Sequence, residues 1–269
     1  MKYKVGIIGC GNMGKILVDA LCSLVNKKNI FCFDVDAEKL KEIKKSYKVN
    51  ICSSNKEVVL NSDIIIFAVK PQQMNEVVEE IKEYVDETKV IVSIAAGIKI
   101  AFFNKNFKNN PVIRIMPNLP IKNSCGVSAI CKNNLCRKKE YEFVKKIFER
   151  KGVVVEVKEK LMDLITAVSG SGPAYIFYVS EIIQKVASKL GLDKKIVPKI
   201  VNYTILGAAK MLTEEELSAE ELRKAVTSKK GTTEQAIKVF KSWGLEKIFY
   251  TAIKKAMYRA KELSEEVSK

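Results

Sequence analysis

The sequence predicts an α/β fold in which a Rossmann-type parallel sheet domain precedes an all-α domain. Over the first half of the chain, short apolar runs rich in valine and isoleucine alternate with amphipathic stretches. This alternation is typical of a parallel sheet that is covered by helices on both faces. After about Glu159 the strand signals stop, and only long helical patterns follow. We therefore predict one domain at residues 1–159 and a second at residues 160–269.

The elements of the two domains follow from these patterns. Apolar runs predict strands at residues 2–9, 29–34, 63–70, 89–96, 111–118, 126–132 and 152–158. In the same domain, helices with one apolar face are predicted at residues 14–25, 37–47, 72–85 and 137–152. The second domain is predicted to contain helices at residues 173–191, 193–212, 218–228, 232–243 and 246–267. Because Pro198 lies early in the second of these, that helix should either begin near it or kink there.

The predicted helix at residues 173–191 is apolar around much of its circumference. A helix of this kind must be buried, and a domain of about a hundred residues has a small interior in which to bury it. The surface of a second copy of the chain is the natural partner. We therefore expect a homodimer or a larger assembly built from dimers, which makes the second domain a dimerisation domain.

The composition excludes several kinds of site. The chain of 269 residues contains no histidine, which removes Ser-His-Asp catalysis, Cys-His catalysis and histidine metal ligands. Its seven cysteines form no paired C-x-x-C motif, so they make a poor zinc site and a poor disulfide framework. We expect no bound metal, and we expect cysteines that stay reduced, as they do in the cytoplasm.

Charge and hydropathy exclude further partners. The amino terminus does not have the pattern of a signal peptide, and no apolar stretch approaches the roughly 18 residues of a membrane span. The net charge of +16 would fit nucleic-acid binding, but the lysines alternate with glutamates and no aromatic and basic module accompanies them. The sequence therefore predicts a cytoplasmic protein with neither a membrane nor a nucleic-acid partner.

The first predicted strand runs directly into a G-x-G-x-x-G motif that opens a helix. The motif consists of Gly9, Cys10, Gly11, Asn12, Met13 and Gly14. In this setting the first glycine makes a tight turn, the second lets the backbone approach a pyrophosphate, and the third lets the helix pack on the strand. The next predicted strand ends at Asp34, about twenty residues further on, where an acid contacts ribose hydroxyls. Together these features predict a dinucleotide site.

Asp34 also bears on which nucleotide binds. A carboxylate at this position accepts hydrogen bonds from a ribose diol, whereas it repels a 2′-phosphate, and no arginine follows to offset the repulsion. The cofactor is therefore expected to be NADH or NADPH, with a preference for NADH.

Four further segments make the chain resemble the pyrroline-5-carboxylate reductase family over essentially its whole length. They are AVKP at residues 68–71, RIMPNLP at residues 114–120, SGSGPAY at residues 169–175 and GTT at residues 231–233. LGAAKML at residues 206–212 adds to the match. The resemblance implies hydride transfer from NADH or NADPH to the C=N bond of (S)-1-pyrroline-5-carboxylate. This reaction gives L-proline and is the last step of proline synthesis.

The resemblance also implies further cofactor contacts. The implied residues are Asn55, Ala68, Val69, Lys70, Pro71, Ile94, Ala95 and Ala96. AVKP ends an apolar strand at its carboxyl end, which is the edge where ligands bind in open parallel sheets. RIMPNLP likewise follows a strand, but it carries Leu119 where the family usually has threonine. SGSGPAY is expected to be a flexible turn that feeds a helix, with Pro173 in the first turn of that helix.

The GTT segment opens the predicted helix at residues 232–243, so its amides and hydroxyls would offer hydrogen bonds to a small carboxylate. The resemblance implies a substrate site made of Glu216, Ser228, Gly231, Thr232 and Thr233. Within this set Thr233 is the expected catalytic residue, because its hydroxyl would hydrogen-bond near the ring nitrogen and orient the imine.

One departure from the family pattern affects the substrate loop. The family usually has Ser-Pro-Gly-Gly before the threonines, whereas this chain has Ser228, Lys229, Lys230 and Gly231. Because a lysine tolerates a positive φ poorly, the loop is expected either to take another shape or to add positive charge where a carboxylate docks. Two alternatives stay open: a related reductase that acts on another imine or on a ketone, and a dinucleotide-binding paralogue without turnover.

Overall fold

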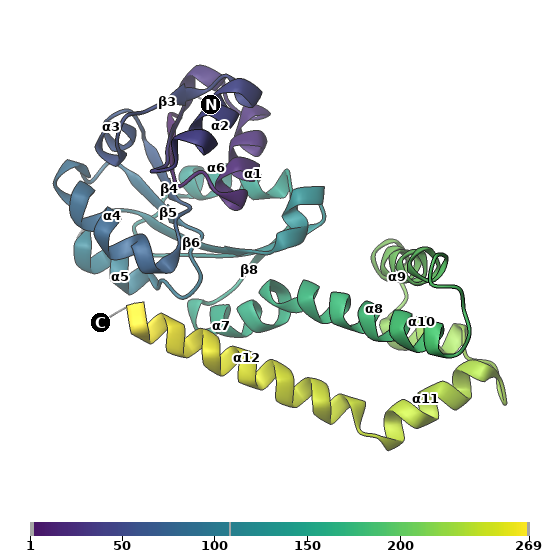
Figure 1. Ribbon diagram of the computed structural model, residues 1–269. Helices are drawn as coiled ribbons and strands as arrows, with labels where there is room; N and C mark the ends of the chain where they lie inside the picture. Colours follow the sequence, from purple (N-terminus) through teal and green to yellow (C-terminus); the bar gives the residue numbers. More distant parts are fainter. Residues whose placement is uncertain (1–2, 108, 268–269) are drawn as a thin grey trace. The chain divides into compact units, whose positions relative to one another are not determined.

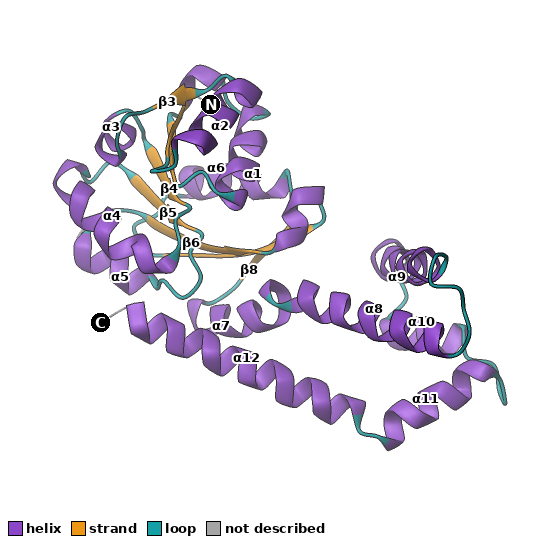
Figure 2. Cartoon of the chain, in the orientation of Figure 1, coloured by secondary structure: helices purple, strands orange, loops and turns teal. Residues whose placement is uncertain are grey.

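The computed structural model describes residues 3–107 and 109–267 and divides them into two compact units. One unit contains the residues up to Ser171 together with those from Ala256 onward, and the other is Gly172–Lys255. Figure 1 traces the chain, and Figure 2 shows that the strands all belong to the first unit. The predicted boundary after residue 159 falls between the last strand and this division, and it stays a prediction. The outer ends of the predicted domains and residue 2 of the first predicted strand lie outside the described residues.

A sheet forms the centre of the first unit, with the strand order β3-β2-β1-β4-β5-β6-β7-β8. The strands are β1 (Val5–Ile8), β2 (Ile30–Phe33), β3 (Asn50–Ile51), β4 (Ile64–Phe67), β5 (Val90–Ser93), β6 (Val112–Pro117), β7 (Gly126–Lys132) and β8 (Gly152–Glu156). Strands β1 to β6 pair in parallel, which confirms the predicted Rossmann-type class.

The last two strands run in the opposite direction to the others. β7 pairs antiparallel with β6, and β8 pairs in parallel with β7. The sheet is therefore mixed, whereas the sequence predicted a parallel one. The physical reason is the short connection at residues 118–125, because parallel neighbours need a crossover of a dozen or more residues. β7 and β8 are joined by such a crossover, which contains α6 (Lys138–Glu149).

Helices cover both faces of the sheet in this unit. The other helices are α1 (Asn12–Cys22), α2 (Ala37–Tyr47), α3 (Asn55–Leu60), α4 (Met74–Ile81), α5 (Ile100–Asn106) and α7 (Met162–Ile165). Because side chains alternate along a strand, Ile64 and Ile66 join the core under α1, α2 and α6, while Ile65 and Phe67 join the core under α3, α4 and α5. The two sets of helices lie on opposite sides of the sheet in Figure 1.

The segment expected to be a flexible Gly/Ser turn is helical instead. Residues Thr166–Gly170 form a π-helical turn that continues α7 and leads into α8 (Gly172–Lys189). The N–H of Ser171 donates to the carbonyl of Thr166 at 2.9 Å, which is the spacing of a π-helix. Pro173 lies in the first turn of α8, as predicted, because its missing N–H costs nothing there.

The second unit consists of helices with few buried side chains. After α8 come α9 (Val197–Glu214), α10 (Ala219–Ala225), α11 (Thr232–Ser242) and the first part of α12 (Leu245–Val267). Helix α9 begins one residue before Pro198, as predicted. Within the single chain, the buried residues of this unit are Ser180, Val197, Val201 and Leu222. On α8, by contrast, Phe177 and Tyr178 are each 62% exposed. None of the described helices is both long and apolar enough to cross a membrane.

Candidate active site

The glycine turn follows β1 and adopts the conformation that the motif requires. Gly9 has a φ of 95°, in the region that favours glycine, and its N–H donates to the carbonyl of Phe33 on β2. Helix α1 begins at Asn12 without a side-chain cap, so its first amides have no partner from a capping side chain. A helix start of this kind is a ready site for the phosphates of a dinucleotide.

The two other glycines of the motif have different roles. A Cβ on Gly14 would lie 2.1 Å from the carbonyl oxygen of Gly9, so only glycine lets α1 approach the turn this closely. A Cβ on Gly11 would meet no atom within 4 Å. Gly11 therefore borders open space, which is the place where a ligand's pyrophosphate would approach the backbone. The turn fits the dinucleotide that the sequence implies.

Asp34 follows β2, and its carboxylate is held against the glycine turn. One oxygen accepts the N–H of Cys10 at 2.6 Å, and the other accepts the N–H of Asp36 at 2.9 Å. The side chain is only 10% exposed, and the Lys39 ammonium lies 3.5 Å from it. The oxygen that accepts the Cys10 N–H can accept a second hydrogen bond, so Asp34 has the capacity to bind a ribose hydroxyl as well. The other oxygen already accepts a second one from the Lys39 ammonium.

Asp36 and Lys39 form a second polar contact at the same place. The Lys39 ammonium lies 3.3 Å from the Asp36 carboxylate, which also caps the amino end of α2. Hydrogen bonding to the Lys39 ammonium lowers the pKa of the Asp36 carboxyl. Desolvation opposes the charge on Lys39, but hydrogen bonding to Asp36 and the charge of Asp34 outweigh it and raise the pKa of Lys39. One cation is thus shared by two carboxylates.

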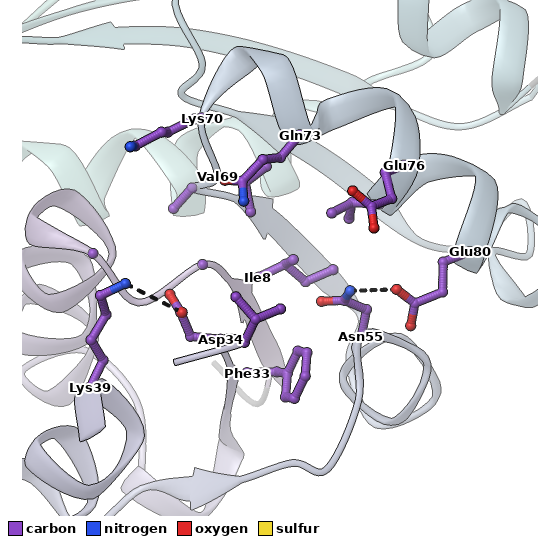
Figure 3. A pocket seen from close by; sticks show the side chains of 15 residues that line it. Ile8, Phe33, Asp34, Lys39, Asn55, Val69, Lys70, Gln73, Glu76 and Glu80 are labelled. Carbon is purple, nitrogen blue, oxygen red and sulfur yellow. Dashed lines mark hydrogen bonds and ion pairs between the residues drawn. The ribbon is translucent and has the colours of Figure 1, made fainter. Parts of the chain in front are cut away.

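A pocket lies at the carboxyl ends of β1, β2 and β4, where these residues meet (Figure 3). The predicted cofactor residues that line it are Gly9, Gly11, Asp34, Asn55, Ala68, Val69 and Lys70. Asn55 is buried, and its amide donates to the Glu80 carboxylate at 2.7 Å, as the dashed line in Figure 3 marks. The structure thus brings together predicted residues from four separate segments of the chain.

The other predicted cofactor residues do not line the pocket. They are Cys10, Asn12, Met13, Gly14, Pro71, Ile94, Ala95 and Ala96. The last three follow β5 at the same sheet edge, where the N–H of Ile94 donates to the carbonyl of Phe67. Pro71 begins a short 3-10 helix after Lys70. Their contact with a cofactor stays a prediction.

Sequence reasoning missed part of the pocket wall. The polar residues concerned are Lys39 from α2, Gln73 from the 3-10 helix before α4, and Glu76 and Glu80 from α4. The spacing of Gln73, Glu76 and Glu80 is a signal that could have revealed them, since side chains three or four residues apart share one helix face. For Lys39 the signal is its position three residues after the capping Asp36.

The predicted substrate residues belong to the second unit. Gly231 caps α11, Thr232 and Thr233 form the first turn of that helix, and no side chain caps it. A Cβ on Gly231 would lie 2.3 Å from the Ser228 hydroxyl, so the loop and the helix start are closely packed. The N–H of Gly231 donates to the carbonyl of Ser228 at 3.0 Å. The structure therefore brings Ser228 and the GTT segment together.

Lys230 occupies the left-handed region, with a φ of 62°. The loop before α11 therefore has a positive φ at this position, and a lysine adopts it. The backbone N–H of Lys230 donates to the Glu234 carboxylate at 2.8 Å, which stabilises this conformation.

Two further residues that were named from the sequence lie outside both the pocket and the GTT loop. Glu216 is exposed in the connection between α9 and α10, and no hydrogen bond or ion pair joins it to the GTT loop within residues 109–267. Leu119, which stands where the family usually has threonine, is 52% exposed and begins a 3-10 helix after β6. In the described parts of the chain, no cluster of three or more Cys, Asp or Glu side chains is placed to hold a metal ion.

Comparison with protein families gives two matches, in different parts of the chain. Residues 159–263 match the family described as "Pyrroline-5-carboxylate reductase dimerisation". Residues 4–97 match the family described as "NADP oxidoreductase coenzyme F420-dependent". The first match covers the helical part of the chain, and the second covers the glycine turn and the strands β1 to β5.

Individual relatives match over nearly their whole length. A pyrroline-5-carboxylate reductase of Methanosarcina acetivorans is 35% identical over 97% of this chain and 97% of its own length. The solved structure of a pyrroline-5-carboxylate reductase from Coxiella burnetii matches with a TM-score of 0.92 and 36% identity, over 98% of this chain and 99% of that one. A pyrroline carboxylate reductase of Plasmodium falciparum, solved with NADP bound, matches with a TM-score of 0.85 and 28% identity over 98% of both chains.

Alanine substitutions at Gly11 and Gly14 should separate binding from folding. Gly11→Ala fills only open space and should leave the melting temperature nearly unchanged, while it weakens NADH binding by about tenfold or more. Gly14→Ala forces a Cβ into a backbone carbonyl and should lower the melting temperature markedly. Thermal melts and fluorescence titrations with NADH measure both effects. Unchanged NADH affinity in Gly11→Ala would contradict the placement of the pyrophosphate at this turn.

Proposed function

Because the chain belongs to the pyrroline-5-carboxylate reductase family, we propose that it reduces the C=N bond of (S)-1-pyrroline-5-carboxylate to give L-proline. The chain is an NAD(P)H-dependent oxidoreductase, and the family implies a place in proline biosynthesis. The observation that carries this conclusion is the relationship over the full length, at 35% identity across 97% of both chains. It covers the glycine turn and the GTT helix start together.

We propose that the first unit binds the dinucleotide with the residues that surround the pocket. The amides at the start of α1 would meet the phosphates, and Asp34 would accept hydrogen bonds from the ribose. Lys70 and the loop after β5 would lie further along the sheet edge. When bound, the nicotinamide supplies the hydride, so the chain itself provides binding and orientation.

The substrate site is proposed at the start of α11, in the second of the two predicted domains. The uncapped amides of Thr232 and Thr233 and the threonine hydroxyls can hold a carboxylate, and Lys229 and Lys230 add positive charge beside them. Glu216 stays a proposed substrate contact on the basis of the family alone. This division of labour corresponds to the predicted boundary, with the dinucleotide on residues 1–159 and the imino acid on residues 160–269.

Thr233 is proposed as the catalytic residue. A cyclic imine is basic enough to be protonated easily, so the absence of histidine is no obstacle to the reaction. The task that remains for the protein is to orient the imine, and a hydroxyl on the first turn of a helix is well placed to hydrogen-bond near the ring nitrogen.

The function is tested by following NADH oxidation in the presence of pyrroline-5-carboxylate. Thr233→Ala should lower kcat/KM by roughly one to two orders of magnitude, because the imine loses a group that orients it in the transition state. Thr213→Ala is a matched control, since the hydroxyl of Thr213 bonds only to carbonyls of its own helix.

The assay also distinguishes the alternatives. Turnover of other cyclic imines or of ketones, but not of pyrroline-5-carboxylate, would establish a related reductase with another substrate. Binding of NADH without any oxidation would establish a non-catalytic paralogue. Thr233→Ala kinetics equal to those of the wild type would remove the proposed role of Thr233.

We further propose that the pocket prefers NADH to NADPH. Asp34 and Asp36 place two negative charges where a 2′-phosphate would lie, and Lys39 offsets only one of them. A net negative charge repels the phosphate, whereas the Asp34 carboxylate can accept the hydrogen bonds of a ribose diol. The charge of Lys39 should therefore reduce the preference for NADH over NADPH, and the charge of Asp36 should increase it.

Titrations of nucleotide fluorescence with variants of these side chains test this proposal. Lys39→Met should increase the ratio of NADH to NADPH affinity by about tenfold, because one charge is removed near the phosphate. Asp36→Asn should lower the ratio, and it should keep the cap of α2, since asparagine caps helices as well as aspartate does. Lys41→Met is the control, because Lys41 pairs with Glu38 at the surface. A wild-type preference for NADPH, or equal effects of Lys39→Met on both nucleotides, would contradict the proposal.

The chain forms a homo-oligomer through its dimerisation region, and we propose that the assembly is a dimer or is built from dimers. The support is the large apolar surface of α8 and α9, where Phe177, Tyr178 and Tyr203 are each more than 60% exposed in the single chain. We also propose a cytoplasmic location without a nucleic-acid partner. The seven free cysteines support a reducing compartment.

Light scattering at micromolar concentration tests the assembly. The expected mass is that of a dimer or of an even multiple of the 30.2 kDa chain. Phe177→Lys should shift the mass toward the monomer, because it places a charge in an apolar interface. A wild-type protein that is monomeric under these conditions would contradict the proposal.

A further inference from the structure

One face of β6 contacts the segment that leads from the sheet to α8. Side chains at alternate positions of a strand share a face, and Arg114, Met116 and Asn118 form such a series at the end of β6. Each of the three contacts a residue between Glu159 and Gly170. Two motifs of the sequence, RIMPNLP and SGSGPAY, thus meet in the first unit.

Arg114 makes the first of these contacts. Its side chain is 4% exposed, and its guanidinium lies 3.0 Å from the Glu159 carboxylate and 3.9 Å from that of Asp163 at the start of α7. The same Glu159 oxygen accepts the N–H of Ile100 at 2.8 Å. A buried cation with two carboxylate partners fixes the start of α7 against the sheet, since a buried charge is costly without them.

Met116 and Asn118 contact the carboxyl-terminal end of the segment between Glu159 and Gly170. A Cβ on Gly170 would lie 3.0 Å from the methyl group of Met116, so the π-helical turn packs closely on the strand. The amide of Asn118 donates to both the carbonyl and the hydroxyl of Ser169 at 3.2 Å. Its oxygen accepts the N–H of Val127 at 2.8 Å. Asn118 is buried, and its side chain therefore joins β7 to the π-helical turn.

The position of this contact relates it to the dinucleotide site. β2, β1, β4, β5 and β6 are parallel neighbours, so their carboxyl ends form one edge in that order. The edge begins with Asp34 after β2, continues with the glycine turn after β1 and with Lys70 after β4, and ends with Asn118 after β6. If the adenosine ribose lies at Asp34, the other half of a dinucleotide extends along the edge toward β5 and β6.

We propose that Asn118 is a positioning residue, which holds Ser169 and the π-helical turn at the nicotinamide end of the sheet edge. π-helical turns are rare in proteins, and those that occur often lie at functional sites. This turn is fixed by side chains from outside the helix. The function of the three β6 contacts is then to set the orientation of the turn, and Ser169 is the residue presented to the nicotinamide half. The kinetic part of this inference rests on the proposed function, whereas the position of the turn does not.

Hydrogen exchange tests directly whether the π-helical turn lies at the nicotinamide end of the sheet edge. In the wild-type protein, saturating NADH should slow the exchange of the amides at residues 166–171, whereas saturating AMP, which lacks the nicotinamide half, should not. In Asn118→Ala these amides should exchange at least about tenfold faster, and the protection by NADH should be lost. Protection by AMP equal to that by NADH, or no protection by either, would overturn the placement.

Kinetics with three variants test the positioning role. Asn118→Ala should lower kcat about ten- to hundredfold, with a smaller effect on the Kd of NADH, because a small misplacement near the reacting atoms is costly. Asn118→Asp keeps an acceptor for the N–H of Val127 but turns a carboxylate oxygen toward the Ser169 carbonyl, so it should lose kcat as well. Ser169→Ala removes one of the two acceptors and should have a smaller effect. Wild-type kcat in Asn118→Asp would mean that Asn118 only anchors β7, and this would overturn the proposal.

Asn110→Ala is the matched control. Asn110 is also a buried asparagine beside β6, but it lies at the opposite end of the strand, where its amide donates to the carbonyls of Asp86 and Lys89 at 2.7 and 2.8 Å. Its loss should lower the melting temperature about as much as the loss of Asn118, and it should leave kcat unchanged. An equal loss of kcat in both variants would show a structural effect alone and would overturn the proposal. A wild-type protein that does not reduce pyrroline-5-carboxylate would count against the proposed function, while the exchange experiment would still decide the position of the turn.

Discussion

The hydrogen bond from the N–H of Cys10 to the Asp34 carboxylate joins the ends of β1 and β2, and the proposed dinucleotide site is built around it. The same carboxylate that fits a ribose holds the glycine turn in place. A substitution at position 34 would therefore disturb the turn and the nucleotide preference together. The Lys39 ammonium and the backbone N–H of Asp36 bind the other oxygen of Asp34. Substitution of the Lys39 and Asp36 side chains can therefore change the preference while the Cys10 hydrogen bond stays in place.

Much of the fold and of the pocket could be predicted because short signals repeat along the chain. The alternation of strands and helices predicted β1, β2, β4, β5 and β6, and the glycine motif with Asp34 predicted the pocket. β3, α3, α5 and α7 were missed, because two to seven residues are too few to show a period. The short connection before β7 is visible in the sequence, and the reversal could have been predicted from it. The contact of Asn118 with Ser169, by contrast, joins two residues that lie 51 positions apart. Local patterns do not contain such information.

The second unit contains both the apolar surface of α8 and α9 and the proposed substrate loop before α11. Ser180, Val197, Val201 and Leu222 are its buried residues within the single chain, which is too little to fix a helical unit of this size. The proposed substrate loop starts α11 in this unit, so its geometry depends on whatever covers the apolar faces of the helices. Burial against a second copy would stabilise the fold and order the loop by the same contacts.

The substrate loop also shows how a residue that departs from the family pattern can be accommodated. A lysine in the left-handed region costs roughly 1–2 kcal/mol. The hydrogen bond from the Lys230 N–H to the Glu234 carboxylate can offset about that amount, since hydrogen bonds to charged groups contribute roughly 1.5–3 kcal/mol. Lys238, 3.5 Å from the same carboxylate oxygen, helps to hold the Glu234 side chain in place. The loop can therefore keep the conformation of a glycine-containing one, while its two lysines make the start of α11 more attractive to a carboxylate.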